Sequence, residues 1–414
     1  MGRLLMVESW VGAMSTLLPR AIGEAGHGFT FLTRDLGHYL RSRQGGETHP
    51  LLGAENVLTA ETNDLPELLE RAERLQEVFG FDGVLTSCDY YLPAVAHLAR
   101  RLGLPGAAPE AVERACRKDL ARRALTEAGV AGPRYAVTRD WPETLEAAGE
   151  LGFPLVIKPV DLCAGMYVRK VSSEAELREA FLALEGFPVN ARGQARSPLV
   201  LLEELLHGPE VSVETVTFEG DTRVVGVTDK SLAGEPWFVE SGHMFPARLA
   251  PEAAEGAAAL AVAALEALGF DHGVAHTEIR LTPDGPRLVE VNPRPAGNRI
   301  TELVRRVTGI DLALAHARLA LGERPDTRPV DTGVRSAAVV FLVPGRTGRI
   351  ASIDGVPDVP EAVDVEVRPV GHRVGDTTSN NGYLGHVLVV DTAGDGALAR
   401  AEELAAGIRV EYAA

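Results

Sequence analysis

The first hundred residues alternate short apolar runs with longer amphipathic segments, and this alternation restricts the fold more than any other feature of the chain. The apolar runs predict strands at residues 3–8, 28–34, 55–60 and 81–87. The amphipathic segments predict helices at residues 15–26, 65–80 and 91–103. Consecutive strand–helix–strand units place their strands parallel in one sheet. We therefore expect a parallel-sheet domain over residues 1–108.

The turn after the first predicted strand limits what this Rossmann-like domain can bind. Residues 8–15 read ESWVGAMS, and they lack the Gly-x-Gly-x-x-Gly pattern that brings a helix N-terminus against a dinucleotide pyrophosphate. The Gly-rich phosphate loop of the Walker type is absent from the whole sequence as well. Dinucleotide binding and P-loop chemistry are therefore not expected.

Composition excludes further classes of protein. A formal net charge of −17 disfavours a nucleic-acid binder, because phosphate contacts need clustered Lys and Arg. No apolar run approaches the ~20 residues that span a bilayer, and Glu8 stands where a secretory signal would continue its apolar segment. Cys88, Cys116 and Cys163 are widely spaced, which argues against a disulfide framework and a structural zinc site. We expect a cytoplasmic protein without membrane or nucleic-acid partners.

A small module follows within residues 109–206. It opens with one predicted helix that runs from Pro109 to Gly129. Its later segments are predicted strands and one helix: strands at 153–160, within 161–171 and at 199–206, and a helix at 172–184. Ser173 and Glu176 have the spacing of a capping box at the start of that helix. The pattern indicates a β-loop-β-helix-β unit between larger domains.

Longer alternating strands characterise residues 207–326. The predicted elements are strands at 210–220 and 222–232, a strand pair within 274–293, and helices at 252–268 and 300–322. Residues 327–414 read as a mostly β subdomain that ends in a helix at 395–407. The chain is thus predicted to have four regions of mixed α/β and α+β character.

Polar side chains recur at every second position in PRLVEVNPRPAGNRI, residues 286–300. Glu290, Asn292 and Arg294 project to the same face of an extended chain, and the nearby prolines end any central strand. A carboxylate, an amide and a guanidinium therefore meet at the mouth of a sheet. A solvated strand end would give the same pattern, so the assignment depends on the other polar residues of the chain.

The order of these polar residues resembles that of the ATP-grasp superfamily of ATP-dependent carboxylate–amine ligases. The resemblance covers about residues 1–325 and depends on the combination of Lys118, Lys158, Glu203, Glu204, Glu210, Glu278, Glu290, Asn292 and Arg294. It implies the ATP-grasp fold, with a Rossmann-like N-terminal domain, a lid subdomain, a large subdomain and a mostly β C-terminal subdomain. It also implies ATP and Mg²⁺ as cofactors, with Mn²⁺ as an alternative ion.

Two lysines occupy positions where this family contacts phosphate. Lys158 closes the apolar strand PLVIKP, where a lysine is costly to bury without an anionic partner, and Lys118 lies on the preceding helix. The loop DLCAGMYVRKV has fewer glycines than the family's phosphate-covering loop, but its backbone N–H groups can still bind phosphate. Cys163 in this loop is either a nucleophile or a packed thiol, and the lack of a neighbouring base favours the packed thiol.

The stretch LLEELLHGPEVSVE, residues 201–214, matches the family's hinge over the adenine. The resemblance implies that Glu203 accepts from the adenine amino group, that the Leu206 backbone contacts the ring edge, and that Glu210 accepts from the ribose hydroxyls. Glu204 is assigned to the same nucleotide-binding strand. The structural alternative is that these acidic residues form the outward face of a strand.

The resemblance also explains the alternation in residues 286–300. Glu278 and Glu290 lie on predicted antiparallel neighbours and can point to one face, and Asn292 follows along that face. Two carboxylates and an amide oxygen are suitable ligands for Mg²⁺. Arg294 lies past the ion, where as the catalytic residue it can hold the transferring phosphoryl group or the resulting acyl phosphate.

The segments DKSLAGEPWFVESGHMFPARL and PRPAGNRI resemble the branch that includes bacterial L-amino acid ligases, which join two unprotected amino acids. The GHxxP element implies that His243 contacts the acceptor substrate. Gly297 and Arg294 would help hold an amino-acid carboxylate, and Trp237 and Phe238 would shape the pocket. Simple packing is the alternative for His243, Trp237 and Phe238, and His276 is predicted to be structural.

The implied reaction is phosphorylation of a small carboxylate by ATP, followed by attack of an amine and release of phosphate. An ATP-grasp enzyme that phosphorylates a one-carbon acid, and a nucleotide-binding module without catalysis, are the alternatives. The complete set that ends in Arg294 argues against the second, and the GHxxP element argues against the first. The expected partners are small-molecule substrates, and a homodimer is left open.

Overall fold

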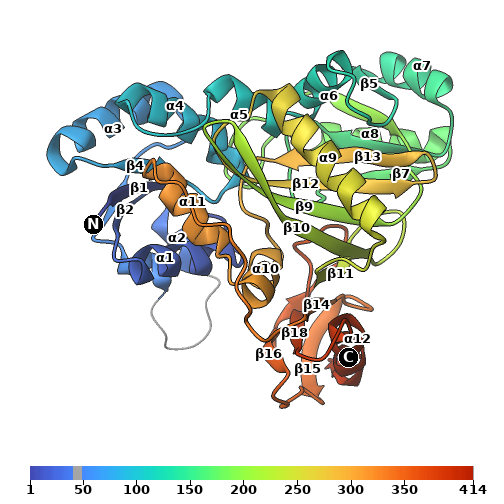
Figure 1. Ribbon diagram of the computed structural model, residues 1–414. Helices are drawn as coiled ribbons and strands as arrows, with labels where there is room; N and C mark the ends of the chain where they lie inside the picture. The colour runs from blue at the N-terminus through green and yellow to red at the C-terminus, as the bar shows by residue number, and fades with distance from the viewer. Residues whose placement is uncertain (41–48, 414) are drawn as a thin grey trace.

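The computed structural model describes residues 1–40 and 49–413. Its N-terminal domain, blue in Figure 1, is a four-stranded sheet in the order β3-β2-β1-β4. The strands are β1 (Arg3–Val7), β2 (Gly28–Thr33), β3 (Asn56–Thr59) and β4 (Gly83–Leu85). Every pairing in this sheet is parallel. The parallel sheet predicted from the alternation is confirmed.

Helices cover this sheet and follow from local sequence signals. They are α1 (Met14–Glu24), α2 (Leu36–Leu40), α3 (Leu65–Phe79) and α4 (Leu92–Leu102), with short 3₁₀ turns η1 (Pro50–Gly53) and η2 (Asp89–Tyr91). In α3 the Asp64 carboxylate accepts from the Glu67 N–H at 3.0 Å, and Gly80 ends the helix in the left-handed conformation. Helix α3 buries Leu68 and Leu75 on one face against the sheet.

The single helix predicted from Pro109 to Gly129 is wrong. The chain forms α5 (Pro109–Cys116) and α6 (Lys118–Glu127), which are separated by Arg117 in an extended conformation. The Lys118 N–H, freed from the helical pattern, donates to the Val160 carbonyl of the lid at 3.0 Å. A tertiary hydrogen bond therefore compensates the break and fixes Lys118 beside the lid.

The lid is a four-stranded sheet in the order β5-β8-β6-β7. Its elements are β5 (Tyr135–Thr138), α7 (Trp141–Leu151), β6 (Leu155–Pro159), β7 (Arg169–Val171), α8 (Glu174–Glu185) and β8 (Val200–Glu204). The predicted N-cap is present, because the Ser173 hydroxyl accepts from the Glu176 N–H at 3.3 Å, while the Glu176 carboxylate closes the box one residue earlier, on the Ser172 N–H. Buried apolar side chains, among them Ile157 and Phe181, give the lid a hydrophobic core of its own.

The lid also contacts the N-terminal domain through Arg192. The Arg192 guanidinium lies over the Tyr39 ring at 5.2 Å and donates to the Ser9 carbonyl. In return, the Arg34 side chain donates to the Arg192 carbonyl at 2.6 Å. Arg192 is 6% exposed, so this contact is buried between the two modules. It fixes one side of the cavity described below.

The central sheet has eight strands in the order β13-β12-β9-β10-β11-β14-β18-β16. The large subdomain contributes β9 (Glu210–Phe218), β10 (Asp221–Leu232), β11 (Glu240–Phe245), β12 (Gly273–Thr282) and β13 (Gly285–Asn292). Helix α9 (Pro251–Leu268) packs on them through small side chains such as Ala257, Ala261 and Ala264. The other three strands come from the C-terminal subdomain, so the sheet continues across the predicted boundary at residue 326.

The single helix predicted at 300–322 is also wrong. The chain forms α10 (Ile300–Thr308) and α11 (Leu312–Ala320), with Gly309 between them at φ 74°. A side chain at Gly309 would place its Cβ 2.4 Å from the Val330 side chain, so the turn requires glycine. The break lets α11 pack Ala313 and Ala317 into the core of the N-terminal domain.

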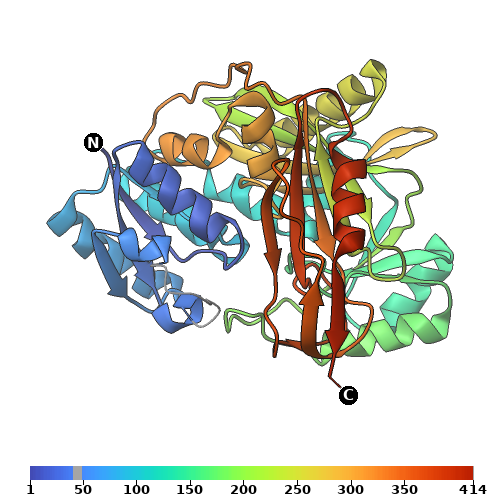
Figure 2. The same ribbon diagram turned by 90° about the horizontal axis from the view of Figure 1, so that it is seen from below.

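The C-terminal subdomain, red in Figure 2, is mostly β as predicted. Its elements are β14 (Ser336–Leu342), β15 (Gly348–Asp354), β16 (Ala362–Val367), β17 (Arg373–Val374), β18 (Gly385–Asp391), α12 (Ala397–Gly407) and β19 (Arg409–Tyr412). Strands β17, β15 and β19 form a separate three-stranded sheet. Across the residues that the structure describes, no helix combines the length and apolar character needed to cross a membrane.

Candidate active site

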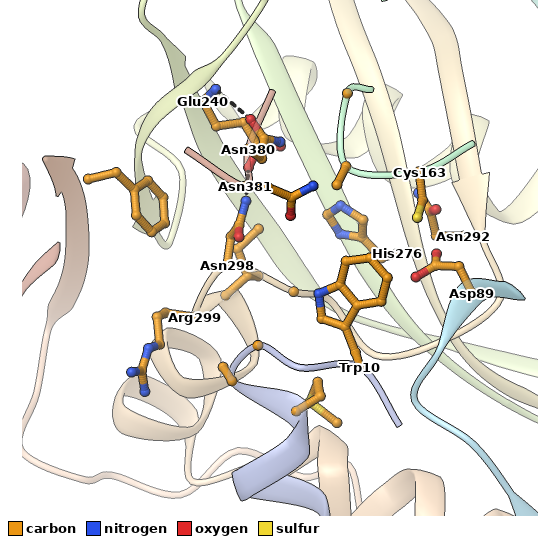
Figure 3. Close-up of a pocket in the computed structure, with 18 of the residues that line it drawn as sticks. Trp10, Asp89, Cys163, Glu240, His276, Asn292, Asn298, Arg299, Asn380 and Asn381 are labelled. Atoms are coloured by element: carbon orange, nitrogen blue, oxygen red, sulfur yellow. Dashed lines mark hydrogen bonds between the residues drawn. The ribbon is translucent and has the colours of Figure 1, made fainter. Parts of the chain in front are cut away.

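A cavity of about 1310 Å³ lies where all four regions of the chain meet. Figure 3 shows its wall. The N-terminal domain contributes Trp10 and Asp89, the lid contributes Cys163, and the large subdomain contributes His276, among others. The C-terminal subdomain contributes Asn380 and its neighbours. The wall therefore joins segments that are far apart in the sequence.

The cavity also gathers nearly all of the residues predicted from the sequence. Those that line it are Lys118, Lys158, Glu203, Glu204, Leu206, Glu210, Glu278, Glu290, Asn292, Arg294 and Gly297. The exception is His243, which is fully buried behind the wall. The structure thus brings the predicted phosphate, hinge and metal residues to one place, while their individual roles stay predictions.

The predicted metal ligands lie on paired strands. In the antiparallel register of β12 and β13, Glu278 stands directly opposite Glu290, and His276 stands opposite Asn292. The cross-strand pairing expected from the sequence is therefore present. Residues at alternate positions share a face, so the carboxylates and the Asn292 amide can face the cavity together.

The chemistry of these residues fits a divalent cation of the magnesium type. Burial raises the pKa of Glu278, but the neighbouring Lys230 and His276 outweigh it and hold that pKa well below its usual range. Glu278 is therefore a carboxylate that can bind a hard cation. Among the described residues, no group of three or more His, Cys, Asp and Glu could hold a metal ion. Glu278 and Glu290 would therefore need the Asn292 amide and ligand oxygens to complete the coordination.

Lys118 connects Glu290, one of the predicted metal ligands, to the lid loop. Its ammonium lies 3.0 Å from the Glu290 carboxylate and donates to the Leu162 carbonyl at 2.6 Å. Burial lowers the pKa of Lys118, but the Glu290 carboxylate outweighs burial and the net pKa is raised. Lys118 is therefore a firmly charged ammonium at the cavity wall, as a phosphate contact requires.

Lys158 forms a buried ion pair with the hinge strand. Its ammonium lies 2.7 Å from the Glu203 carboxylate, which also accepts from the Arg122 side chain at 2.6 Å. Burial lowers the pKa of Lys158 below its ordinary value in spite of Glu203. Burial raises the pKa of Glu203, but Arg122 and Lys158 reverse that effect. Glu203 is an ionised carboxylate held by two cations, and sequence reasoning did not identify Arg122.

Lys230 is the main cation that sequence reasoning missed. Its ammonium lies 3.0 Å from Glu210, 3.0 Å from Glu240 and 2.7 Å from Glu278. Burial lowers the pKa of Lys230, but the three carboxylates raise it well above its usual value. A lysine in the interior of the predicted strand 222–232 was the available signal, because a buried lysine needs anionic partners.

Arg294 is held by the N-terminal domain. Its Nε donates to the Asp89 carboxylate at 2.7 Å, and its side chain also donates to the Pro295 carbonyl at 3.0 Å. Burial lowers the pKa of Arg294, but Asp89 outweighs it and the net pKa is raised. Asp89 follows the carboxyl end of parallel strand β4, where ligands bind in open α/β sheets, and that position could have indicated it.

His243 does not line the cavity but contacts two residues that do, Glu240 and Phe341. The His243 ring lies 3.1 Å from the Glu240 carboxylate and packs edge-on against Phe341 at 5.4 Å. Glu240 itself lines the cavity and accepts from the Asn298 side chain. Burial raises the pKa of Glu240, but Lys230 reverses this and the pKa lies well below its usual range. The structure therefore puts Glu240, and not His243, at the wall.

The loop that covers the cavity has an unusual backbone. Ala164, Gly165 and Tyr167 all have positive φ angles, between 57° and 68°. Such turns direct successive N–H groups to one side and suit an anion. Burial raises the pKa of the Cys163 thiol, so Cys163 is protonated and a weak nucleophile. This supports the packed thiol over the nucleophile.

The fold and this cavity define an enzyme of the ATP-grasp type, in which a small lid with the buried Lys158, and Lys118 beside it, covers an antiparallel sheet that presents oxygen ligands. The chain belongs to the ATP-grasp family. Residues 23–106 match the family's N-terminal domain, residues 151–302 match the ATP-grasp domain, and residues 340–413 match the L-amino acid ligase C-terminal domain 2.

Curated proteins similar to this chain support the assignment. An uncharacterized protein, y4rH of Sinorhizobium fredii, is 32% identical over 84% of this chain and 72% of its own length. Carnosine synthase 1 of Gallus gallus is 31% identical over 69% of this chain, and alanine–anticapsin ligase of Bacillus subtilis is 28% identical over 60%. This chain spans only 33% and 55% of those two proteins, respectively.

A solved structure resembles the whole chain. The L-amino acid ligase from Bacillus licheniformis has a TM-score of 0.81 and 24% sequence identity, and the match covers 100% of this chain and 99% of that one. The phosphoribosylglycinamide synthetase from Anaerococcus prevotii has a TM-score of 0.71 at 18% identity. At these identities the likeness concerns the fold.

Proposed function

We propose that this chain uses ATP to phosphorylate the carboxylate of an amino acid or another small acid, and then couples it to an amine with release of ADP and phosphate. One observation carries the proposal: Lys118, Lys158, Glu278, Glu290 and Arg294 line a single cavity. The names of two relatives, carnosine synthase and alanine–anticapsin ligase, support amino acids as the substrates.

The chemistry explains why ATP is needed. A carboxylate resists attack by an amine because its leaving group would be oxide. In the proposed first step, a carboxylate oxygen attacks the γ-phosphorus and the bond to the ADP oxygen breaks. In the second step, the amine lone pair attacks the acyl carbon, the C–O bond to phosphate breaks, and the amine proton is lost to phosphate or solvent. Both steps need a site that excludes water, since water would hydrolyse the acyl phosphate.

The charged and polar residues of the cavity would have different roles in these two steps. Lys118 and Lys158 would neutralise phosphate charge, and Arg294 would bind the phosphoryl oxygens as charge develops. Glu278, Glu290 and Asn292 would hold Mg²⁺ or Mn²⁺, which neutralises the β- and γ-phosphate charge when bound. The remaining proposed contacts concern the nucleotide and the substrate: Glu203, Glu204, Leu206 and Glu210 for the nucleotide, and Gly297 for the substrate.

The cellular compartment and the partners of the protein are also proposals. The cysteines are free in the structure, which suits the cytoplasm. Small molecules are the proposed partners, and a homodimer stays a prediction.

The test is ADP and phosphate release by the purified chain with Mg²⁺ and ATP, across pairs of free amino acids. Bicarbonate and formate serve as one-carbon controls, and mass spectrometry identifies the product. We expect release that depends on an amino acid and an amide product in equal amount. Release that depends only on bicarbonate or formate would favour a one-carbon acid instead. If the chain binds nucleotide but releases neither ADP nor phosphate under any of these conditions, it would be a nucleotide-binding module without catalysis.

A further inference from the structure

The C-terminal subdomain reaches the cavity through the loop between β17 and β18. This loop lies outside the segment 151–302 that matches the ATP-grasp domain. Asn380 and Asn381, at its tip, line the cavity and are labelled in Figure 3 beside Glu240 and Asn298.

Asn380 links three parts of the wall. Its backbone N–H donates to the Ala164 carbonyl in the lid loop at 3.1 Å. Its side-chain oxygen accepts from the Glu240 N–H at 3.0 Å and lies 3.1 Å from the Tyr383 hydroxyl. One residue of the C-terminal subdomain therefore connects the phosphate-covering loop to the strand that carries Glu240.

Tyr383 makes this connection rigid. Its hydroxyl lies 2.8 Å from the Glu240 carbonyl, and its ring stacks on Phe341 with centroids 4.4 Å apart and planes at 13°. The loop thus binds both the N–H and the carbonyl of Glu240. The Glu240 side chain is held separately by Lys230, His243 and Asn298. The orientation of this carboxylate in the cavity depends on contacts from two subdomains.

Asn381 differs from its neighbour in having no protein partner. Its side chain is exposed, points into the cavity in Figure 3, and makes no hydrogen bond to any residue in 1–40 or 49–413. A carboxamide offers one acceptor and two donors, so it can bind either an ammonium or a carboxylate. In Figure 3 it lies on the side of Glu240 and Asn298, opposite Asp89 and Asn292.

We propose that the C-terminal subdomain completes the substrate end of the active site, with Asn380 as a positioning residue for Glu240 and Asn381 as a direct contact to the substrate. The class of ligand is a small molecule with amino and carboxylate groups. This proposal rests on the proposed function for the identity of the ligand. The hydrogen bonds of Asn380 are independent of that function.

Hydrogen exchange tests Asn380 without turnover. Asn380→Ala removes the acceptor for the Glu240 N–H, so exchange in the segment around Glu240 should become at least several-fold faster. Asn380→Asp keeps an acceptor oxygen and should restore most of the protection. Thr378→Ala, at an exposed position of the same loop, is the matched control and should exchange like the unmodified chain. Unchanged exchange around Glu240 in Asn380→Ala would overturn the positioning role.

Equilibrium binding tests Asn381. Calorimetry in the presence of Mg²⁺ and ADP would measure the binding of L-alanine, L-glutamine and L-methionine, and separately the binding of ADP. Asn381→Leu keeps the side-chain volume and should weaken amino-acid binding by at least about 10-fold, the loss of a hydrogen bond to a charged group, while ADP binding stays unchanged. Equal affinities in the variant and the original chain, or no binding of any of the three amino acids, would overturn the contact.

These outcomes are separable from failure of the proposed function. If no amino acid elicits ADP release but the exchange and calorimetric results are as expected, the loop belongs to a binding site for amino acids and the ligase activity is wrong. If ADP release occurs but Asn381→Leu leaves amino-acid affinity unchanged, the activity stands and the substrate role of Asn381 fails.

Discussion

The Lys230 ammonium lies 2.7 Å from the Glu278 carboxylate, at the centre of a buried charge cluster. Glu210 and Glu240 contact the same ammonium, and the Lys230 side chain is only 1% exposed. The four residues come from neighbouring strands of the central sheet, β9 to β12. One cation therefore contacts a predicted ribose contact, Glu210, a predicted metal ligand, Glu278, and Glu240 on the cavity wall.

Lys230→Met should destabilise the fold strongly. The substitution keeps the length of the side chain but removes the cation that three buried carboxylates share. Arg280 stays beside Glu210 and His276 stays beside Glu278, but neither replaces the shared ammonium. Removing one partner of a buried ion pair typically costs about 3–5 kcal/mol. Urea unfolding would measure the loss. Lys170→Met, which breaks the more exposed pair with Glu235, is the control and should cost at most about 1 kcal/mol. Similar losses for the two variants would contradict the central role of Lys230.

The Glu278 and Glu290 pair was predictable because it depends on local geometry. Alternation fixes which side chains share a face of a strand, and a short turn joins β12 to β13 and restricts the register. The same reasoning predicted the parallel sheet and the capping box at Ser173. For the strand pair and the capping box the determining contacts are close in sequence, and the parallel sheet follows from the alternation of strands and helices along the chain.

The parts that sequence reasoning missed depend on distant contacts. Asp89 and Arg294 are 205 residues apart, and only the packing of the N-terminal domain on the sheet brings them together. The helix break at Arg117 likewise goes with a distant contact, from the Lys118 N–H to the Val160 carbonyl. The break at Gly309 is the exception, because the left-handed Gly309 and the Asp311 N-cap are local signals that an argument from periodicity alone does not use. Periodicity therefore overestimated the helix lengths.

Glu290→Gln should raise the Mg²⁺ concentration needed for ADP release and lower the maximal rate. The amide keeps the shape but removes a charged oxygen ligand, and it also weakens the contact to Lys118. A titration of initial rate against Mg²⁺ would measure the shift, which we expect to be at least about 10-fold, the scale of altered metal-site contacts. Asp284→Asn, on the exposed turn between the two strands, should titrate like the original chain. An unshifted curve for Glu290→Gln would exclude Glu290 as a ligand.

Lys158→Ala should weaken ATP binding, and Lys158→Arg should restore it only in part. The planar guanidinium places its donors differently from an ammonium, although both carry the charge. Glu203 keeps Arg122 as a partner in either variant, so the hinge retains one ion pair. Calorimetry with ATP would measure the affinities, and thermal unfolding would check that each variant folds. The same affinity for ATP in Lys158→Ala and the original chain would refute the phosphate contact.

Protonation of His316 should destabilise the folded protein in mild acid. Burial lowers the pKa of this ring from 6.5 to about 4, and its Nε2–H donates to the Thr86 carbonyl at 3.0 Å. Since the folded pKa is depressed, the unfolded chain binds the proton first, and stability is lost as the pH falls from about 6.5 toward 4. Allowing for partial exposure, we expect a loss of about 1–3 kcal/mol over this range.

Urea unfolding of His316→Gln at several pH values would test this expectation. Glutamine keeps a donor for the Thr86 carbonyl but cannot titrate, so its free energy of unfolding should vary less between pH 6.5 and pH 4. Parallel pH profiles for the variant and the original chain would show that another group dominates acid unfolding.

Substitutions of Arg294 should separate an effect on catalysis from an effect on binding. If Arg294 binds the phosphoryl group more strongly in the transition state than in bound ATP, Arg294→Ala should lower kcat far more than it weakens ATP affinity. Loss of such a charge-assisted donor costs about 10²–10³ in rate. Lysine at this position should recover little, because it cannot present two parallel donors.

Asp89 adds a second test of the same role. Asp89→Asn keeps the shape but weakens the 2.7 Å contact that orients Arg294, so kcat should fall by less than in Arg294→Ala. In the double variant the Asp89 substitution should lower kcat little further, because Asp89 acts on the reaction by orienting Arg294. Additive losses would mean that Asp89 acts on the reaction independently. A near-normal kcat in Arg294→Ala with only a raised KM for one amino acid would make Arg294 an anchor for the substrate carboxylate, and Lys118, Lys158 and the metal would then have to stabilise the phosphoryl group without it.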